Sequence, residues 1–247
     1  MRDFEESTLW RVSEFERIRQ ETGSSGYMSL SGQASALSTT LVSDLRVLER
    51  RHAHRDVLEV MAACVRHREP ALLYLSLDEV VWPVTVFPQQ MLYHSPRDVA
   101  EASAEGFAAL TLMSVEPPGV KAPGHWMYES AGLEACYRPL VPLLWSLALK
   151  GPRQDLLDEI AGPAVYRLMH GRLPESVTAP GALGSAVERL RRESVPLRTI
   201  AGWPGMSHER ASRLLNGLYM ASELMITRSH PAARDPGAKG LFGWKRR

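Results

Sequence analysis

The stretch from Leu197 to His230, LRTIAGWPGMSHERASRLLNGLYMASELMITRSH, constrains the fold more than any other part of the chain. Pro196 suits the start of a short helix, Gly205 can take the positive φ of a turn, and Ser207 is a typical N-cap for a longer helix. The buried stripe of that longer helix is formed by Ala211, Leu214, Leu215 and Leu218. The stretch therefore predicts a helix, a turn, a second helix and then an extended segment, ELMITRSH.

The flanking residues extend this pattern on both sides. Leu183, Val187 and Leu190 recur at the spacing of one apolar helix face, which predicts a further helix before Pro196. After the extended segment, PAARDPGAKG has the composition of a loop, and LFGWKRR at 241–247 is predicted to be a return strand. We therefore expect three helices followed by a two-stranded ribbon.

Residues 183–244 resemble a winged helix-turn-helix domain. The small residue Ala201, the turn at Gly205 and the pair Leu214 and Leu215 match the small and apolar positions of that family. Most of its members bind DNA, whereas others dimerise or dock proteins, so the resemblance implies a fold more directly than a function.

A helical wheel with the apolar stripe turned inward places Glu209, Ser212, Arg213, Asn216 and Met220 on the outer face. In the major groove, arginine can pair with guanine and asparagine with adenine, which suits Arg213 and Asn216. Basic residues of the ribbon and tail are placed to contact phosphates. The predicted DNA-binding residues are Ser207, His208, Arg210, Ser212, Arg213, Asn216, Arg228, Lys239, Lys245 and Arg246.

Two residues of the same face favour a different partner. Glu209 would repel phosphates unless it accepted a bond from a cytosine amine, and an exposed Met220 is better suited to a protein contact. The alternative is therefore a protein-docking surface that includes Met220, Trp203 and the leucine stripe from Leu37 to Leu48.

The charge is distributed unevenly along the chain. Residues 181–247 contain twelve Lys or Arg and five Asp or Glu, a net charge of +7; the other 17 basic and 23 acidic residues give −6 for residues 1–180. A basic C-terminal part is typical of a protein with an anionic partner, although acidic and basic lobes can also face each other.

The first 171 residues predict an α+β domain. Apolar spacing predicts helices at about 4–21 and 36–68, and short runs rich in β-branched and aromatic residues after Pro70 predict a small antiparallel sheet. Pro83 would mark its strand as an edge or a bulge. The fold class expected is α+β, with N-terminal helices and a small antiparallel sheet followed by a C-terminal winged helix-turn-helix.

The end of this domain and its connection follow from prolines and glycines. A helix is expected to end at Gly151 and another to start on Pro152, and PAVYRLM fits either a strand or a helical turn. The Pro, Gly and Ser content of the following residues predicts a linker. We thus expect an acidic sensory or dimerisation domain at 1–171, a linker at 172–182 and a basic winged-helix domain at 183–247.

Several functional classes find no support in the sequence. It contains no apolar run long enough to span a membrane and no secretory signal, which predicts a cytoplasmic protein. His52, His54 and His67 lack the spacing of a helical metal site, and Cys64 and Cys136 form no CxxC pair, so neither a metal nor another cofactor is expected. No catalytic motif is present, and we predict that the protein is not an enzyme, although a cysteine acting with a distant histidine stays open.

These patterns lead to two functional hypotheses. The first is a DNA-binding transcriptional regulator, a homodimer that presents two reading helices to double-stranded DNA, with its N-terminal domain sensing a ligand or partner. The alternative is a non-catalytic adaptor or assembly protein that docks a protein partner through the winged helix and the leucine-rich helices.

Overall fold

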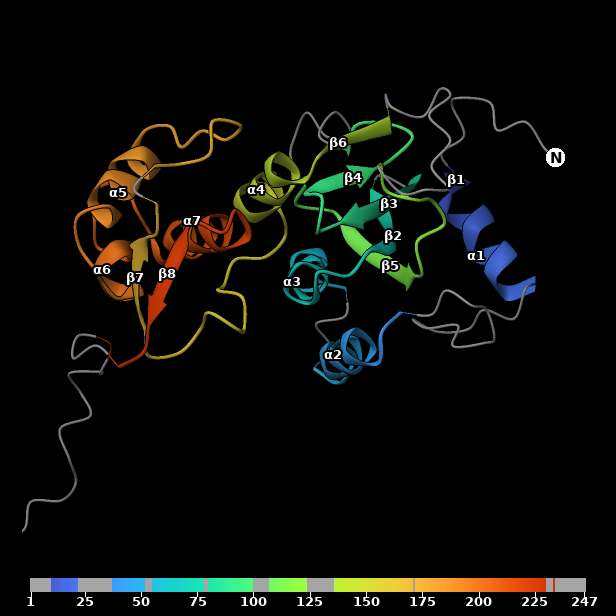
Figure 1. The fold of residues 1–247 in the computed structure, drawn as a ribbon, viewed down its shortest axis with the longest axis horizontal. Coiled ribbons are helices and arrows are strands. Elements are labelled where there is room, and N and C mark those ends of the chain that lie inside the picture. The colour runs from blue at the N-terminus through green and yellow to red at the C-terminus, as the bar shows by residue number, and fades with distance from the viewer. Residues whose placement is uncertain are drawn as a thin grey trace, which may run out of the picture. The chain divides into compact units, whose positions relative to one another are not determined.

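The computed structural model describes residues 10–21, 37–51, 55–77, 80–99, 107–123, 136–170, 172–229 and residue 233. Within these residues the chain forms two compact units, Met1–Arg153 and Gln154–Arg247. Figure 1 labels the helices and strands of both units. The unit boundary lies earlier than the linker expected at 172–182, which instead connects two elements of the C-terminal unit.

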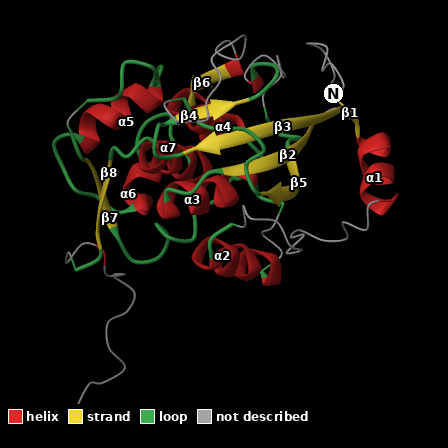
Figure 2. Cartoon of the chain, turned by 45° about the vertical axis from the view of Figure 1, so that its right-hand side comes forward, coloured by secondary structure: helices red, strands yellow, loops and turns green. Residues whose placement is uncertain are grey.

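The N-terminal unit contains a six-stranded antiparallel sheet. Its main path runs in the order β5 (Thr111–Glu116), β2 (Ala71–Leu77), β3 (Val80–Phe87), β4 (Leu92–His94) and β6 (Tyr137–Pro139), and β1 (Trp10–Arg11) also pairs with β3. Figure 2 shows β2, β3 and β5 side by side in yellow. The α+β prediction and the small antiparallel sheet are confirmed.

The sequence predicted an edge or a bulge at Pro83, but β3 is an interior strand of the sheet. Pro83 pairs with Tyr74 of β2 on one side, whereas β1 pairs only with residues 80–81 and β4 only with residues 85–87 on the other. Among the described residues, none pairs with Pro83 on that second side, where a missing N–H is tolerated.

Helices α1 (Val12–Glu21), α2 (Thr39–Arg50), α3 (Val57–His67) and α4 (Leu140–Lys150) complete the N-terminal unit. The helical region expected at 36–68 is two helices, because Asp56 caps α3 by accepting bonds from the backbone N–H groups of Leu58 and Glu59. The leucine stripe is not an exposed docking surface: Leu41, Leu45 and Leu48 are buried.

The C-terminal unit contains α5 (Ala182–Leu190), α6 (Leu197–Ala201) and α7 (His208–Met220), with β7 (Val165–Leu168) before them and β8 (Leu224–Thr227) after them. Gly205 has a φ of +73°, and the Ser207 side chain accepts a hydrogen bond from the N–H of Arg210, as expected. The helix expected from Pro152 is absent, since residues 152–162 form turns instead.

Strand β8 forms its two-stranded sheet with β7, which precedes all three helices. Tyr166 of β7 also forms an isolated antiparallel bridge with Val195, between α5 and α6. The ribbon was expected to pair β8 with residues 241–247, which lie outside the described residues. In the described part of the chain, β7 is therefore the central strand between Val195 and β8.

Candidate functional site

Helix α7 was expected to present a reading face, but its surroundings are those of a core helix. Ser212 and Asn216 have no exposed surface, and Met220 is 1% exposed. These three residues lie on the face that the helical wheel turned outward, so that part of the prediction is wrong. The opposite face, with Leu214, Leu215 and Leu218, is buried as expected. Beyond its first turn, the helix is buried on both sides.

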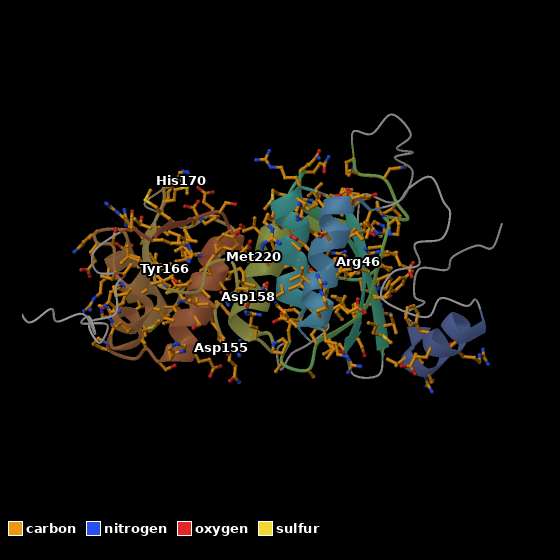
Figure 3. The ribbon with its side chains drawn as sticks, turned by 90° about the horizontal axis from the view of Figure 1, so that it is seen from below. Arg46, Asp155, Asp158, Tyr166, His170 and Met220 are labelled. Atoms are coloured by element: carbon orange, nitrogen blue, oxygen red, sulfur yellow. The ribbon has the colours of Figure 1, made fainter. Side chains whose placement is uncertain are left out.

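Residues 155–161, which we name the covering segment, bind directly to the predicted reading face. The Asn216 Oδ1 atom accepts a hydrogen bond from the N–H of Leu157, and its Nδ2 atom donates to the carbonyl of Asp155, both at 2.9 Å. Leu157 and Ile160 are completely buried. Figure 3 shows Asp155 and Asp158 of this segment together with Met220 of α7. An asparagine held in this way cannot reach a base edge while the segment stays in place.

The ribbon holds the same segment from its other end. The Tyr166 hydroxyl donates to the carbonyl of Ile160 at 2.7 Å, and burial raises the pKa of this tyrosine. Arg228 was expected to contact phosphate, but its guanidinium donates to the carbonyls of Glu159 and Ala161, each at 2.8 Å. Asn216, Tyr166 and Arg228 therefore join α7, β7 and the end of β8 to one segment.

The exposed part of α7 is its first turn. His208, Glu209 and Arg210 are exposed, and the Arg210 guanidinium donates to the carbonyl of Gly205. The Arg213 side chain is 14% exposed and forms an ion pair with Glu209 at 2.8 Å. The acidic Glu209 thus neutralises the arginine that was expected to read guanine. Lys239, Lys245 and Arg246 lie outside the described residues.

One face of the β7–β8 ribbon carries two exposed methionines and the exposed Arg167. Arg167 pairs with Met225 across the two strands, and the N–H of Met169 donates to the carbonyl of Glu223 just beyond them. This register places the side chains of Met169 and Met225 diagonally on the same face, about 7–8 Å apart. They are 47% and 44% exposed, and they are the exposed large hydrophobic residues of the described chain. We name them the methionine pair.

The outer edge of β8 carries backbone groups that face away from β7. Tyr166 exchanges both backbone hydrogen bonds with Val195, so its neighbour Arg167 directs its own N–H and carbonyl toward β8. Met225 is paired with Arg167, so its backbone N–H and carbonyl face β7. The backbone N–H and carbonyl groups of the alternate residues Leu224 and Ile226 therefore point away from β7, toward the outer edge. No other described strand pairs with β8. Such an edge is a template for the addition of another strand.

An open pocket of about 620 Å³ lies at the end of the ribbon, beside His170 and Glu223. The His170 Nδ1 and Glu223 Oε2 atoms, both in its lining, lie 3.0 Å apart. The Glu223 side chain is 13% exposed, whereas that of His170 is 63% exposed and lies at the periphery in Figure 3. The lining is completed by Arg172, Leu173, Pro174, Glu175 and Ser176. Glu175 and Glu223 therefore both line this pocket, and the Glu223 carbonyl accepts the backbone hydrogen bond of Met169.

In the N-terminal unit, one group of charged residues joins distant parts of the chain. Arg153 forms ion pairs with Asp56 at 2.6 Å and with Glu59 at 2.8 Å, and all three side chains are largely buried. Because Asp56 also caps α3, this group fixes the start of that helix to the chain that follows α4. These contacts satisfy one another, which is the arrangement of a structural network.

A second polar group lies at β4 and β6. The Tyr93 hydroxyl donates to Asp98 at 2.8 Å, and Arg138 lies 3.7 Å from the same carboxylate. Burial and Asp98 together raise the pKa of Tyr93. Burial, with a smaller effect of Arg138, lowers the pKa of His94, whose Nε2 atom is buried without a hydrogen-bond partner. This histidine is therefore favoured in its neutral form.

The candidates for nucleophilic and metal chemistry are limited within the described residues. Cys64 is fully buried, and burial raises its pKa to about 12, so its thiol stays protonated near neutral pH. No group of three or more His, Cys, Asp or Glu side chains there could hold a metal ion. His67 pairs with Asp44, while His52 and His54 lie outside the described residues.

Comparisons of the chain with protein-family models, curated proteins and solved structures found no match. No helix in the described part of the chain is both long and apolar enough to cross a membrane. The local chemistry of the surfaces therefore carries the functional argument.

Proposed function

We propose that this protein is a non-catalytic adaptor or assembly protein whose C-terminal unit binds a partner polypeptide through the exposed face of the β7–β8 ribbon. The observation that carries the proposal is the methionine pair, Met169 and Met225. Exposed apolar side chains scattered singly need no explanation, but here both lie on one face of one ribbon. Methionine is unbranched and adaptable, which suits a surface that accepts another protein.

The state of α7 supports this choice over base reading. Ser212 and Asn216 are buried, Asn216 is hydrogen-bonded to the covering segment, and Arg213 is paired with Glu209. Freeing Asn216 for a base would break two hydrogen bonds and expose the apolar side chains of the covering segment. The ribbon face is available to a partner without such a rearrangement.

Paired variants of the full chain test the proposal. Met169→Asp combined with Met225→Asp places charge on the ribbon face, whereas Arg210→Ala combined with Arg213→Ala alters the exposed start of α7. The tagged proteins are purified from the native cells, and polypeptides that co-purify are quantified. We expect a defined partner to be lost with the methionine variant and kept with the arginine variant. Retention with the methionine variant would contradict the proposal.

Binding of duplex DNA is a second candidate, and the net charge of +7 in residues 181–247 favours it. Because Ser212 and Asn216 are enclosed, this binding would rest on phosphate contacts from exposed arginines and the basic tail. It would depend strongly on salt and weakly on sequence. A gel-shift titration of duplex DNA between low and physiological salt distinguishes the two candidates. The docking proposal expects that substitutions in residues 207–216 do not change DNA retention by the protein.

A further inference from the structure

The methionine pair combines exposed thioethers with a neighbour that donates hydrogen bonds. We propose that Met169 and Met225 are a reversible oxidation site, at which a peroxide forms methionine sulfoxides and the Arg167 guanidinium binds the new oxygen atoms. All three residues lie on the exposed face of the β7–β8 ribbon. The oxidation itself does not depend on the proposed function.

Burial divides the methionines of the described chain by their access to an oxidant. Met169 and Met225 are 47% and 44% exposed, whereas Met61 and Met220 are only 0% and 1% exposed. A buried thioether meets an oxidant only in molecules that have opened locally. The same chain therefore contains two accessible methionines and two protected ones that serve as internal references.

Arg167 is the neighbour of both exposed thioethers. It lies directly opposite Met225 in the ladder, where Cβ atoms are about 4.5–5.5 Å apart. It also precedes Met169 by two residues, so their side chains leave the strand on the same face. Arg167 is exposed, and its Nη2 atom donates to the carbonyl of Arg191 at 3.4 Å, a long hydrogen bond. A guanidinium has five N–H donors, so others are left for acceptors on the ribbon face.

Oxidation changes what the two side chains offer to this guanidinium. The thioether sulfur attacks one oxygen of hydrogen peroxide, the O–O bond breaks, and an S–O bond forms. The other oxygen takes up the proton of the attacked oxygen and leaves as water, so the sulfur is oxidised by two electrons and the peroxide is reduced. A thioether is a weak acceptor, whereas the sulfoxide is polar and accepts a hydrogen bond through its oxygen. Arg167 therefore stabilises the oxidised form.

The consequence for docking rests on the proposed function. A partner that contacts the two thioethers through apolar side chains would meet two sulfoxides bound to a guanidinium. Covering these polar groups with apolar surface is unfavourable. Oxidation is therefore expected to release the partner, and reduction of the sulfoxides to restore binding.

Oxidation of the purified full chain tests the site without any partner. The protein is treated with dilute hydrogen peroxide, and peptide mapping by mass spectrometry follows the sulfoxide at each methionine over time. We expect Met169 and Met225 to react at least roughly tenfold faster than Met61 and Met220. Equal rates at the four positions would overturn the proposal.

The role of Arg167 is tested from the reverse reaction. The oxidised wild-type chain and oxidised Arg167→Leu are treated with methionine sulfoxide reductases A and B, which together reduce both sulfoxide epimers. Loss of one hydrogen bond to the sulfoxide is expected to make reduction at Met169 and Met225 about two- to tenfold faster in Arg167→Leu. Arg210→Leu changes an exposed arginine at the start of α7 and should keep the wild-type rate. Equal rates in all three proteins would overturn the binding of the sulfoxides by Arg167.

The double variant Met169→Leu with Met225→Leu separates this proposal from the docking proposal. Leucine keeps an apolar side chain of similar volume but has no sulfur to oxidise. Peroxide added to the native cells is expected to release the partner from the wild-type chain and to leave it bound to the leucine variant. Release from both proteins, or from neither, would overturn control by the methionine pair. A wild-type chain that binds no partner before peroxide is added would overturn docking alone, because the oxidation and reduction rates are measured on the free chain.

Discussion

Replacement of Asn216 by alanine tests whether this residue is a structural link or an exposed reader. The substitution removes the acceptor of the Leu157 N–H and the donor to the Asp155 carbonyl, each at 2.9 Å. The Leu157 N–H would be left buried without a partner, at a cost of about 1–3 kcal/mol. The Asp155 carbonyl belongs to an exposed residue and can bind water, so its loss adds only about 1 kcal/mol. We expect a total loss of about 2–4 kcal/mol.

The assay is urea unfolding of the full chain, with residue-resolved hydrogen exchange at the Leu157 amide. His208→Ala serves as the matched control, because His208 is an exposed residue at the start of the same helix. Its free energy of unfolding should stay within about 0.5 kcal/mol of the wild-type value. If Asn216→Ala were equally neutral and the Leu157 amide exchanged at its wild-type rate, Asn216 would not hold the covering segment, and our account of α7 would be refuted.

Two further predictions concern the N-terminal unit. Arg153→Met removes the ion-pair partner of the buried Glu59 carboxylate, and should lower the free energy of unfolding by about 3–5 kcal/mol in urea titrations. The double variant Arg153→Met with Glu59→Leu should recover part of this loss. Equal losses in the single and the double variant would contradict the pairing. The pKa of His94 is lower in the folded protein than in the unfolded chain, where it is near 6.5. As the pH falls from about 6.5 toward the folded-state pKa, the unfolded chain therefore binds a proton that the folded protein does not. Stability should therefore fall over that window, and His94→Gln should reduce the fall; an unchanged pH profile would show that His94 does not cause it.

Much of the local structure followed from short-range patterns in the sequence. The run Ala71–Leu77 is β2 from end to end, and Ser207, Gly205 and Gly151 occupy the cap and turn positions expected of them. Such features depend on a few neighbouring residues, whose φ preferences and hydrogen-bonding groups can be read directly.

The candidate site could not be predicted in the same way, because it depends on contacts distant in sequence. A helical wheel assigns one inner face, so it turned Ser212, Asn216 and Met220 outward, although α7 is enclosed on a second side. The partner of Asn216 is Leu157, 59 residues away. The apolar pair Leu156 and Leu157 was a usable signal, but it was interpreted as part of a helix.

The pairing in the ribbon also depends on contacts that are distant in sequence. The run around Val165–Leu168 fitted either a strand or a helical turn. The extended segment ELMITRSH was expected to form a hairpin with residues 241–247, because adjacent segments commonly pair. The pairing with β7 closes a loop that contains all three helices, and no local pattern specifies such a distant register. Exposure of Met169 and Met225 follows from this register, so the candidate docking face emerged only with the structure.

Site-specific crosslinking at position 225 tests the central claim most directly. A photoreactive amino acid is placed at Met225 in one full-length protein and at His208 in another, and both are irradiated in the native cells. Our account predicts that position 225 crosslinks to a defined polypeptide, that His208 does not, and that Met169→Asp abolishes the product. Crosslinking of His208 to DNA, with no polypeptide captured at position 225, would contradict it.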